Sequence, residues 1–230
     1  MLKQNYQALV IGSTGAIGQA FVDYFRADPR CAGVQELART TQPGLDLLDP
    51  KSIHAAAQAV ARQGPFQIIV DATGALTIDG QGPEKSIKAL TAEHFTRALQ
   101  VNTIGPALVL QQFAPMLSSG DAIYAKLSAR VGSISDNRLG GWYSYRASKA
   151  AMNMVLQSAA LEWHRRQPGW RFVALQPGTV QSRLSEPFSA GVPLLLEPQV
   201  SVAGLMRALE KLQAQAGAHF IDHQGQTIGW

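Results

Sequence analysis

The chain has 230 residues, of which 46% are hydrophobic and 16% are charged. This is ordinary globular usage and is enough for one domain with a full core, without repeats or low-complexity tracts. The formal net charge is +4 and the isoelectric point is about 9.4. Because the basic residues are dispersed, with Arg165-Arg166 as their only adjacent pair, the sequence predicts a solvated surface and no nucleic-acid partner.

A single cysteine, Cys31, has no cluster of histidines or cysteines around it. It cannot form an internal disulfide, which argues against a secreted scaffold, and it does not mark a zinc site. From Tyr6 the chain goes directly into an apolar strand without a basic-then-apolar leader, and no apolar run reaches membrane-spanning length. We therefore expect a cytoplasmic protein with neither a metal nor a membrane partner.

Short apolar runs alternate with helical patterns along the chain. We expect strands near residues 7–11, 34–38, 66–70, 122–127, 171–175 and 219–222. This alternation is typical of a parallel sheet with helices on both faces. The sequence therefore predicts an α/β fold: a single doubly wound Rossmann-type domain over residues 1–230, with a mostly parallel sheet of about seven strands.

The first strand leads into a glycine-rich turn and then into a helical pattern, the context in which dinucleotides bind. The turn reads Gly12-Ser13-Thr14-Gly15-Ala16-Ile17-Gly18, and all seven residues are predicted cofactor contacts. Gly12 would permit the tight turn, and Gly15 would let the backbone approach a pyrophosphate at the helix N-terminus. Gly18 would let the helix pack on the strand. The alternative is an ordinary strand-to-helix turn.

The end of the second strand indicates which dinucleotide is bound. An NAD site needs an acidic residue about 20 residues beyond the glycine turn, but the chain reads Leu37-Ala-Arg-Thr-Thr41 there. Arg39 can hold a 2′-phosphate through a bidentate contact, helped by the hydroxyls of Thr40 and Thr41. We therefore predict that NADP is preferred and NAD is possible, unless Arg39 is an ordinary surface residue. Asp46 is a further predicted cofactor contact.

Tyr145 and Lys149 are four residues apart in a helical pattern, so they share one face of a helix. Free phenol has a pKa near 10, and an ammonium about 4 Å away would lower it by up to ~3 units. The pair would then exchange a proton near neutral pH, as carbonyl reduction or alcohol oxidation requires. Alone, the pattern also arises by chance on exposed helices, so the glycine turn is needed to support it.

In this order, the motifs resemble those of the short-chain dehydrogenase/reductase family over essentially the whole chain. Asp71-Ala-Thr-Gly74 resembles the segment on the adenine side of the cofactor, and Pro177-Gly-Thr-Val180 resembles the loop that holds the nicotinamide carboxamide. The stretch from Gly140 to Lys149, together with Trp230, is most similar to the C-factor-like and sniffer-like carbonyl reductases. The resemblance adds these predicted cofactor contacts: Ala72, Thr73, Gly74, Tyr145, Lys149, Pro177, Gly178 and Val180.

The resemblance implies hydride transfer between a nicotinamide and a small carbonyl or alcohol substrate. Tyr145 would give or take the proton, while Lys149 would lower the tyrosine pKa and bind the cofactor ribose. Asn102 would hold a water for the proton relay. Alternatively, it is a residue at a helix kink whose side chain satisfies backbone groups beside Pro106. The resemblance also implies a homodimer or homotetramer and a substrate lid at about residues 183–198.

Two features depart from the family pattern. Compact members have three residues between the first two glycines, whereas Gly12 and Gly15 are separated by two, as in the longer, extended members. The serine that bonds the substrate carbonyl in relatives falls on Ala129 here. We predict that Ser133 supplies the missing donor, with Ser128 in reserve. The alternative is that Ser133 is a turn serine that bonds its own backbone.

Two other functions remain open. One is an NADP-binding regulatory or signalling protein of the same fold with little turnover, because one fold hosts many roles. The altered serine position favours this alternative, and the intact Tyr145/Lys149 pair opposes it. The other is an extended-type sugar-nucleotide epimerase, which the glycine spacing favours but which 230 residues leave little room for.

Overall fold

The structure, a computed structural model, describes residues 2–182 and 195–230. Its strands are β1 (Tyr6–Ile11), β2 (Cys31–Leu37), β3 (Ile68–Asp71), β4 (Ala122–Leu127), β5 (Trp170–Gln176) and β6 (His219–Asp222). Its α-helices are α1 (Ala16–Ala27), α2 (Pro50–Val60), α3 (Ala92–Leu99), α4 (Gly105–Phe113), α5 (Tyr143–His164) and α6 (Pro198–Lys211). Short helical turns are η1 (Ala61–Gln63), η2 (Ile87–Ala89), η3 (Gln100–Ile104), η4 (Ala114–Met116) and η5 (Arg130–Gly132).

The strands form one parallel sheet in the order β2-β1-β3-β4-β5-β6. The predicted α/β fold is therefore confirmed, and each of the six expected apolar runs contains a strand. The sheet has six strands within the described residues, one fewer than the estimate of about seven. The third strand begins at Ile68, because Phe66 makes only an isolated bridge with Leu117.

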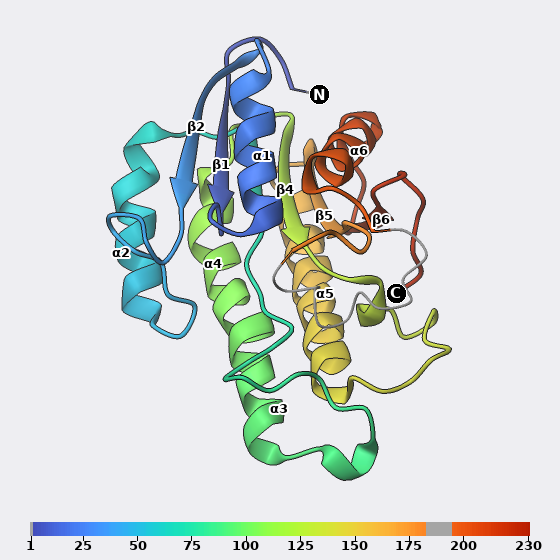
Figure 1. Cartoon of the computed structure of the whole chain (residues 1–230). Coiled ribbons are helices and arrows are strands. Elements are labelled where there is room, and N and C mark those ends of the chain that lie inside the picture. The colour runs from blue at the N-terminus through green and yellow to red at the C-terminus, as the bar shows by residue number, and fades with distance from the viewer. Residues whose placement is uncertain (1, 183–194) are drawn as a thin grey trace.

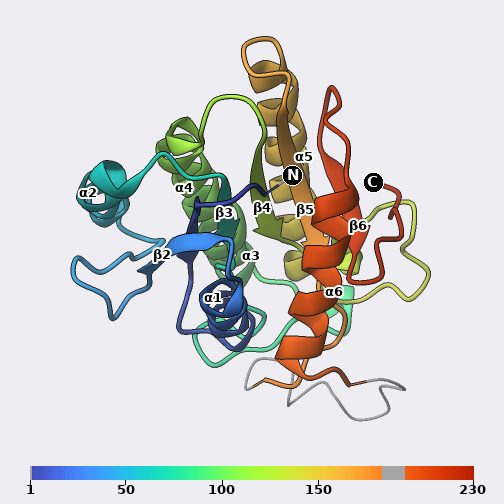
Figure 2. The same cartoon turned by 90° about the horizontal axis from the view of Figure 1, so that it is seen from above.

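Helices cover both faces of the sheet (Figures 1 and 2). One apolar core lies between the sheet and α2, α4 and α5, and a second lies between the sheet and α1 and α6. Side chains alternate along a strand, so neighbouring residues of β4 enter different cores. Tyr124 belongs to the first core and Ile123 to the second. Within the described ranges, no helix is both long and apolar enough to cross a bilayer.

The strand order reverses between β1 and β3. From β1 the chain moves outward to β2 and then crosses back, so that β3 lies on the other side of β1. Open α/β sheets bind ligands at such a reversal, in the crevice beyond the carboxyl ends of the strands. Here those ends are Ile11 and Asp71, which are neighbours in register. The glycine turn after β1 and the segment after β3 therefore meet at this crevice.

A change in helical geometry lies between α3 and α4. The segment η3 is a π-helix, and α4 follows it with Pro106 in its first turn. Proline has no N–H to donate to the preceding turn, and π-helical turns of this kind occur frequently at functional sites. This turn carries the buried Asn102.

Candidate functional site

The glycine turn has two positions where no side chain fits. Gly12 has φ +84°, and a Cβ there would lie 3.0 Å from the carbonyl carbon of Ala72. A Cβ on Gly18 would lie 2.1 Å from the Gly12 carbonyl oxygen, so α1 approaches the turn as closely as its backbone allows. Gly15, in contrast, has only an ordinary contact at 3.5 Å, so packing within the chain does not explain a glycine there.

The other residues of the turn divide into two groups. Ser13 is buried, with its hydroxyl 3.4 Å from the Leu37 carbonyl oxygen, so it stabilises the turn against β2. Thr14 and Ala16 are exposed at the mouth of the turn, and Ile17 is half-buried. No side chain caps the N-terminus of α1, and its first turn has no acidic residue. The backbone N–H groups that a diphosphate would use are therefore left uncovered.

At the end of β2, Arg39 is exposed and its side chain makes no hydrogen bond or ion pair within the described residues. Thr41 does not help it as predicted, because its hydroxyl bonds the backbone N–H and carbonyl of Ala38 at 3.0 and 2.8 Å. Asp46 is also exposed, and its carboxylate accepts from the Leu48 N–H at 3.0 Å. Arg39 alone of these three has an uncommitted side chain.

The segment after β3 joins the glycine turn to the tyrosine helix. The Ala72 N–H donates to the Ile11 carbonyl at 2.8 Å, and the Thr73 hydroxyl bonds Asp71. Gly74 has φ +131°, and a Cβ there would lie 3.2 Å from Lys149 Nζ. This segment therefore lies against Gly12 on one side and Lys149 on the other.

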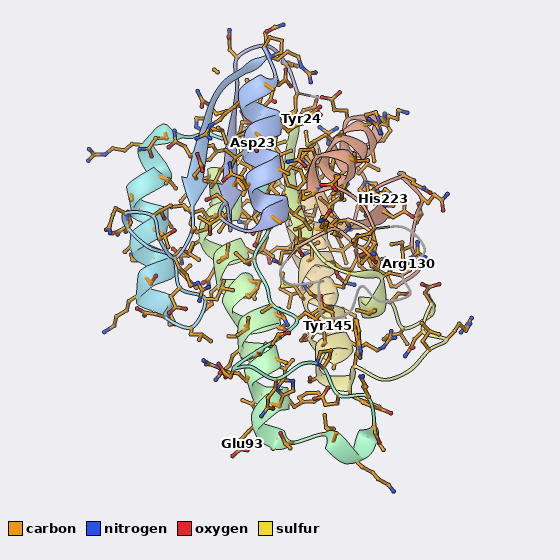
Figure 3. The ribbon with its side chains drawn as sticks, viewed as in Figure 1. Asp23, Tyr24, Glu93, Arg130, Tyr145 and His223 are labelled. Atoms are coloured by element: carbon orange, nitrogen blue, oxygen red, sulfur yellow. The ribbon has the colours of Figure 1, made fainter. Side chains whose placement is uncertain are left out.

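Tyr145 lies near the start of α5, beyond the strand ends (Figure 3), and Lys149 follows it on the same helix. Lys149 is buried, with Nζ 5.7 Å from the centre of the Tyr145 ring and 3.4 Å from the Leu127 carbonyl oxygen. Burial raises the pKa of Tyr145. Burial, and then the charge of Lys126, lower the pKa of Lys149 to about 7, against an opposing effect of Asp71.

The predicted lowering of the Tyr145 pKa is therefore wrong for this structure. The prediction assumed a full ammonium about 4 Å from the phenol. Instead, the lysine nitrogen lies over the ring, its own charge is weakened, and desolvation dominates the tyrosine.

Asn102 is fully buried and bonds the backbone of Ala75 twice. Its Oδ1 accepts from the Ala75 N–H at 2.8 Å, and its Nδ2 donates to the Ala75 carbonyl at 2.9 Å. The side chain thus holds the segment after β3 in place, rather than satisfying helix backbone groups beside Pro106. A Cβ on Gly74 would lie 3.0 Å from Asn102 Oδ1, so Asn102 and Lys149 meet at the same glycine.

The serine hydroxyls are directed elsewhere. Ser128 donates to Asn153 on α5 at 2.6 Å. Ser133 is buried, donates to the Gly229 carbonyl at 2.5 Å and accepts from the Asp136 N–H at 3.1 Å. We therefore correct the prediction for Ser133: its hydroxyl ties a turn to the C-terminal segment, and its proton is donated there.

The loop after β5 contains Pro177, Gly178 and Val180. The Pro177 carbonyl accepts from the Ser201 hydroxyl at 2.6 Å, and Gly178 has φ +80°. Val180 bridges Leu196, the described end of the predicted substrate lid. Residues 183–194 of that lid lie outside the described residues. The loop is therefore fixed to α6 on one side and to the chain entering α6 on the other.

The sequence did not indicate three residues that shape the start of α5. Trp142 has a left-handed backbone, φ +54°, and its ring contacts Tyr145 edge to face at 6.1 Å. Arg146 Nε donates to the Gly141 carbonyl at 2.9 Å and holds this turn. The Glu84 carboxylate bonds Ser144 in the first turn of α5. The Gly140-Gly141 pair was the only signal of this turn, and nothing in the sequence marked Glu84.

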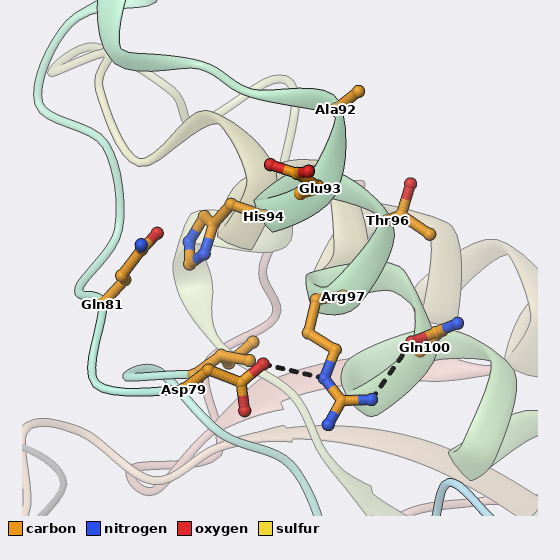
Figure 4. A pocket seen from close by; sticks show the side chains of 9 residues that line it. Asp79, Gln81, Ala92, Glu93, His94, Thr96, Arg97 and Gln100 are labelled. Carbon is orange, nitrogen blue, oxygen red and sulfur yellow. Dashed lines mark hydrogen bonds and ion pairs between the residues drawn. The ribbon is translucent and has the colours of Figure 1, made fainter.

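A cavity of about 500 Å³ lies beside α3 (Figure 4). It is lined by α3 and the loop at residues 78–81, and Arg97 crosses it to bond Asp79 and Gln100. None of its lining residues belongs to the predicted site. In the described part of the chain, no group of three or more His, Cys, Asp and Glu side chains is arranged to hold a metal ion.

Comparison with known proteins identifies the family. The family model of the short chain dehydrogenases matches residues 7–192. The chain therefore belongs to the short-chain dehydrogenase family. It is 30% identical over 207 residues to a 1-hydroxy-2-glutathionyl-2-methyl-3-butene dehydrogenase of Rhodococcus sp. (strain AD45), covering 89% of this chain and 84% of that one. It is 33% identical over 135 residues to the C-signal protein of Myxococcus xanthus, covering 58% and 77%.

Solved structures agree with this assignment. The NADPH-bound carbonyl reductase from chicken fatty liver superposes with a TM-score of 0.83 at 25% identity, over 99% of this chain and 100% of that one. The carbonyl reductase Sniffer of D. melanogaster gives a TM-score of 0.81 at 19% identity, over 99% and 100%, and shows the shared fold. The resemblance to the short-chain dehydrogenase/reductase family, and to its C-factor-like and sniffer-like members, is confirmed.

Proposed function

We propose that this chain is an NADPH-dependent reductase of small carbonyl compounds that also oxidises the corresponding alcohols, with Tyr145 as the proton donor and acceptor. One observation carries the proposal. The segment Ala72–Gly74 is in contact with Gly12 of the glycine turn and with Lys149 of the Tyr145 helix. A dinucleotide bound at the turn would therefore extend to the proton donor.

The residues present fit a dinucleotide, because Gly12 and Gly18 are pressed together while Gly15 and the N-terminus of α1 remain open. The turn at residues 12–18 would hold the diphosphate, and Arg39 would hold a 2′-phosphate. Lys149 and the loop from Pro177 to Val180 would hold the nicotinamide end. When bound, this group supplies or accepts the hydride. The NADPH in the chicken carbonyl reductase supports this choice of cofactor.

The protein's own residues donate the proton and stabilise the substrate oxygen. Because burial raises its pKa, the Tyr145 phenol stays protonated at neutral pH and is ready to donate to the oxygen of a carbonyl. Ala129 cannot donate a hydrogen bond to that oxygen. Stabilisation of the substrate oxygen therefore depends on Tyr145 and on the charge of Lys149. Asn102 keeps the segment around Ala75 against the site. We retain as a proposal that Asn102 also holds the water that resupplies the proton.

Oligomer formation is part of the proposal. Relatives commonly pair through the helices at residues 91–117 and 144–167. Here Ile104 on η3 is 53% exposed, and Met154 and Leu161 on α5 are 65% and 45% exposed. Exposed apolar side chains on neighbouring helices favour a partner surface. Light scattering on the parent and on Met154→Lys tests this: we expect a homodimer or homotetramer that Met154→Lys weakens.

A second function is favoured by the serine geometry. Ala129 cannot bond a substrate, and the hydroxyls of Ser128 and Ser133 are engaged with Asn153 and Gly229. This arrangement suits a protein that binds NADP, responds to it and has little turnover. The name of the Myxococcus relative, C-signal, fits such a role.

One experiment separates the two functions. The purified protein is incubated with NADPH and a panel of aldehydes, ketones and quinones while absorbance at the NADPH band is followed, with Tyr145→Phe as the matched control. The reverse reaction is tested with NADP⁺ and alcohols, including glutathionyl alcohols because of the Rhodococcus relative. Turnover that Tyr145→Phe abolishes supports the reductase. Tight NADPH binding without turnover on any compound supports the regulator.

A further inference from the structure

A second lysine, Lys126, lies beneath the Tyr145–Lys149 pair. It is on β4, two residues after Tyr124, so its side chain points to the same face of the sheet, the face covered by α4 and α5. It is only 1% exposed. Its register neighbour on β3 is Asp71, which is fully buried. Lysine and aspartate are almost never buried to this degree unless they are paired.

The Lys126 ammonium is held entirely by oxygen acceptors. Its Nζ is 3.0 Å from Asp71 Oδ1 and 2.7 Å from the Thr73 carbonyl oxygen. It is also 3.2 Å from the Thr73 hydroxyl. A group with three donors and only acceptors around it is protonated. Burial lowers the pKa of Lys126, but the charge and hydrogen bond of Asp71 oppose this, and Lys126 places a positive charge against the segment that follows β3.

Lys149 also lies against this segment. A Cβ on Gly74, the residue after Thr73, would lie 3.2 Å from Lys149 Nζ. Lys149 Nζ also bonds the carbonyl of Leu127, the residue after Lys126. Both ammonium groups thus lie against Thr73–Gly74, and the charge of Lys126 acts on Lys149. Since both are buried, salt and water screen their repulsion only weakly.

The charged and polar groups that face Lys149 can be named for each neighbouring element. They are Lys126 on β4, Asp71 on β3, Tyr145 on α5 and the amide of Asn102 on η3. Two lysines therefore share one carboxylate. Burial and Lys126 bring the pKa of Lys149 to about 7. At that value Nζ both releases and accepts a proton at neutral pH, as a relay group must.

We propose that Lys126, anchored by Asp71 and Thr73, is a positioning residue of the reaction site whose charge keeps Lys149 ready to exchange a proton at Nζ. In the reductive direction Tyr145 gives its proton to the substrate oxygen, Lys149 returns a proton to Tyr145, and water reprotonates Lys149. This inference rests on the proposed function for the reaction step, although the coupling of the two lysines exists without any substrate.

The test removes both charges of the buried pair at once, in Asp71→Asn/Lys126→Gln. Removing only one would leave the other buried and unpaired, which destabilises strongly. NMR of protein labelled with ¹³C/¹⁵N-lysine follows the titration of Lys149, whose signal is identified by its loss in Lys149→Met. We expect the Lys149 titration near pH 7 in the parent to move upward by about one unit in the double variant.

The matched control is Asp23→Asn/Lys88→Gln, which removes the same two charges at exposed positions. It should leave the Lys149 titration where it is. If the first double variant fails to fold, Asp71→Leu/Lys126→Met replaces the pair by apolar groups and takes its place. A folded variant in which Lys149 titrates at the parental pH overturns the proposal.

A second measurement separates this inference from the proposed function. The pH profile of NADPH-dependent turnover should move in the same direction as the Lys149 titration. A moved titration with an unmoved turnover profile contradicts the role of Lys126 in the reaction. Absence of turnover in every preparation contradicts the reductase and with it the reaction step, whereas the NMR result still decides whether Lys126 acts on Lys149.

Discussion

The Glu84 carboxylate accepts hydrogen bonds from both the backbone N–H and the hydroxyl of Ser144, at 3.1 and 2.8 Å. Ser144 is in the first turn of α5, directly before Tyr145, and the residue at the N-cap, Trp142, supplies no side-chain cap. A carboxylate at a helix N-terminus is stabilised by the helix dipole and satisfies an unpaired N–H. Glu84, from a loop 60 residues earlier in the chain, thus fixes the start of the helix that carries Tyr145.

We expect Glu84→Gln to lower the stability by about 1.5 kcal/mol, because a charged acceptor is replaced by a neutral one. For a chain of this length that corresponds to about 3 to 6 °C in Tm, measurable by calorimetry. Glu93→Gln, an exposed change in the first turn of α3, is the control and should have little effect. Equal Tm values for the parent and Glu84→Gln would contradict the stabilisation of the start of α5 by Glu84.

The pH dependence of this effect has a definite sign. Burial acts to raise the pKa of Glu84, but the hydrogen bonds from Ser144 and from the Glu84 backbone, together with the charge of His94, outweigh it, and the pKa lies below its usual 4.5. The stabilisation is therefore fully present above pH 4.5 and disappears as the pH falls through the folded-state pKa. Denaturant unfolding of the parent and of Glu84→Gln should be measured at neutral and at acid pH. The difference between their free energies of unfolding should shrink as the pH is lowered.

Tyr145→Phe tests the proton donor. Removing a positioned general acid lowers turnover by about 10² to 10⁴, whereas the ring and its packing on Trp142 remain. NADPH affinity, measured by fluorescence titration, should stay nearly constant. If Tyr145→Phe turned over close to the parental rate, Tyr145 would not be the proton donor. Tyr143 would then be the next residue to test.

Lys149→Met should make the protein more stable and less active. The folded-state pKa of Lys149 is lowered from 10.5 to about 7, so the unfolded chain binds more protons between these values. Burial of Lys149 therefore costs stability at pH 7, on the order of 4 kcal/mol, and this cost shrinks as the pH rises toward 10.5. Denaturant unfolding at pH 7 and 10 tests this, with exposed Lys88→Met as the control. A variant less stable than the parent at pH 7 would contradict the assignment.

Ala129→Ser restores a hydroxyl at the family's serine position. The backbone there is extended and the residue is half-buried, so serine fits without strain. Since one hydrogen bond to a developing oxyanion is worth about 10² to 10³ in turnover, we expect a gain up to this size. Ser133→Ala is the comparison. It should lower Tm but leave the turnover of a substrate-active preparation unchanged. A loss of rate without a loss of stability in Ser133→Ala would reinstate the original hypothesis.

Arg39→Ala tests the cofactor preference. Its side chain makes no hydrogen bond or ion pair within the described chain, so its removal should leave the fold unchanged. Loss of a charge-assisted contact to a phosphate should weaken NADPH binding and spare NADH. Dissociation constants from fluorescence titration decide this, with Arg62→Ala as an exposed control. Equal affinities of the parent for NADPH and NADH would contradict the predicted role.

The sequence could predict the sheet because each strand is a local apolar run, and the glycine turn because Gly12 and Gly18 stand at fixed spacing. It could also place Tyr145 and Lys149 on one helix face, since that follows from helical geometry alone. It could not predict the direction of their pKa shifts. Those depend on burial and on Lys126, whose position beneath Lys149 arises only when β3 and β4 pair.

The serine hypothesis shows the same limit. Ser133 has a favourable spacing from Tyr145, but the direction of its hydroxyl depends on the C-terminal segment at Gly229, 96 residues away in the chain. Glu84 was overlooked for a related reason, because its partner Ser144 is brought to it by the fold. Local patterns fix elements and faces, whereas contacts between distant loops decide which polar groups remain available.

The contact between Gly12 and Ala72 has a consequence for the order of folding. The glycine turn is made early in synthesis, but its close partner is at the end of β3, and Ala8 of β1 pairs with Ile68. Pairing of such distant segments is slow, because a long loop must close before the contacts form. A nascent chain that ends before residue 72 thus has the glycine turn without Ala72, its close partner. We infer that cofactor affinity and the cooperative fold arise together.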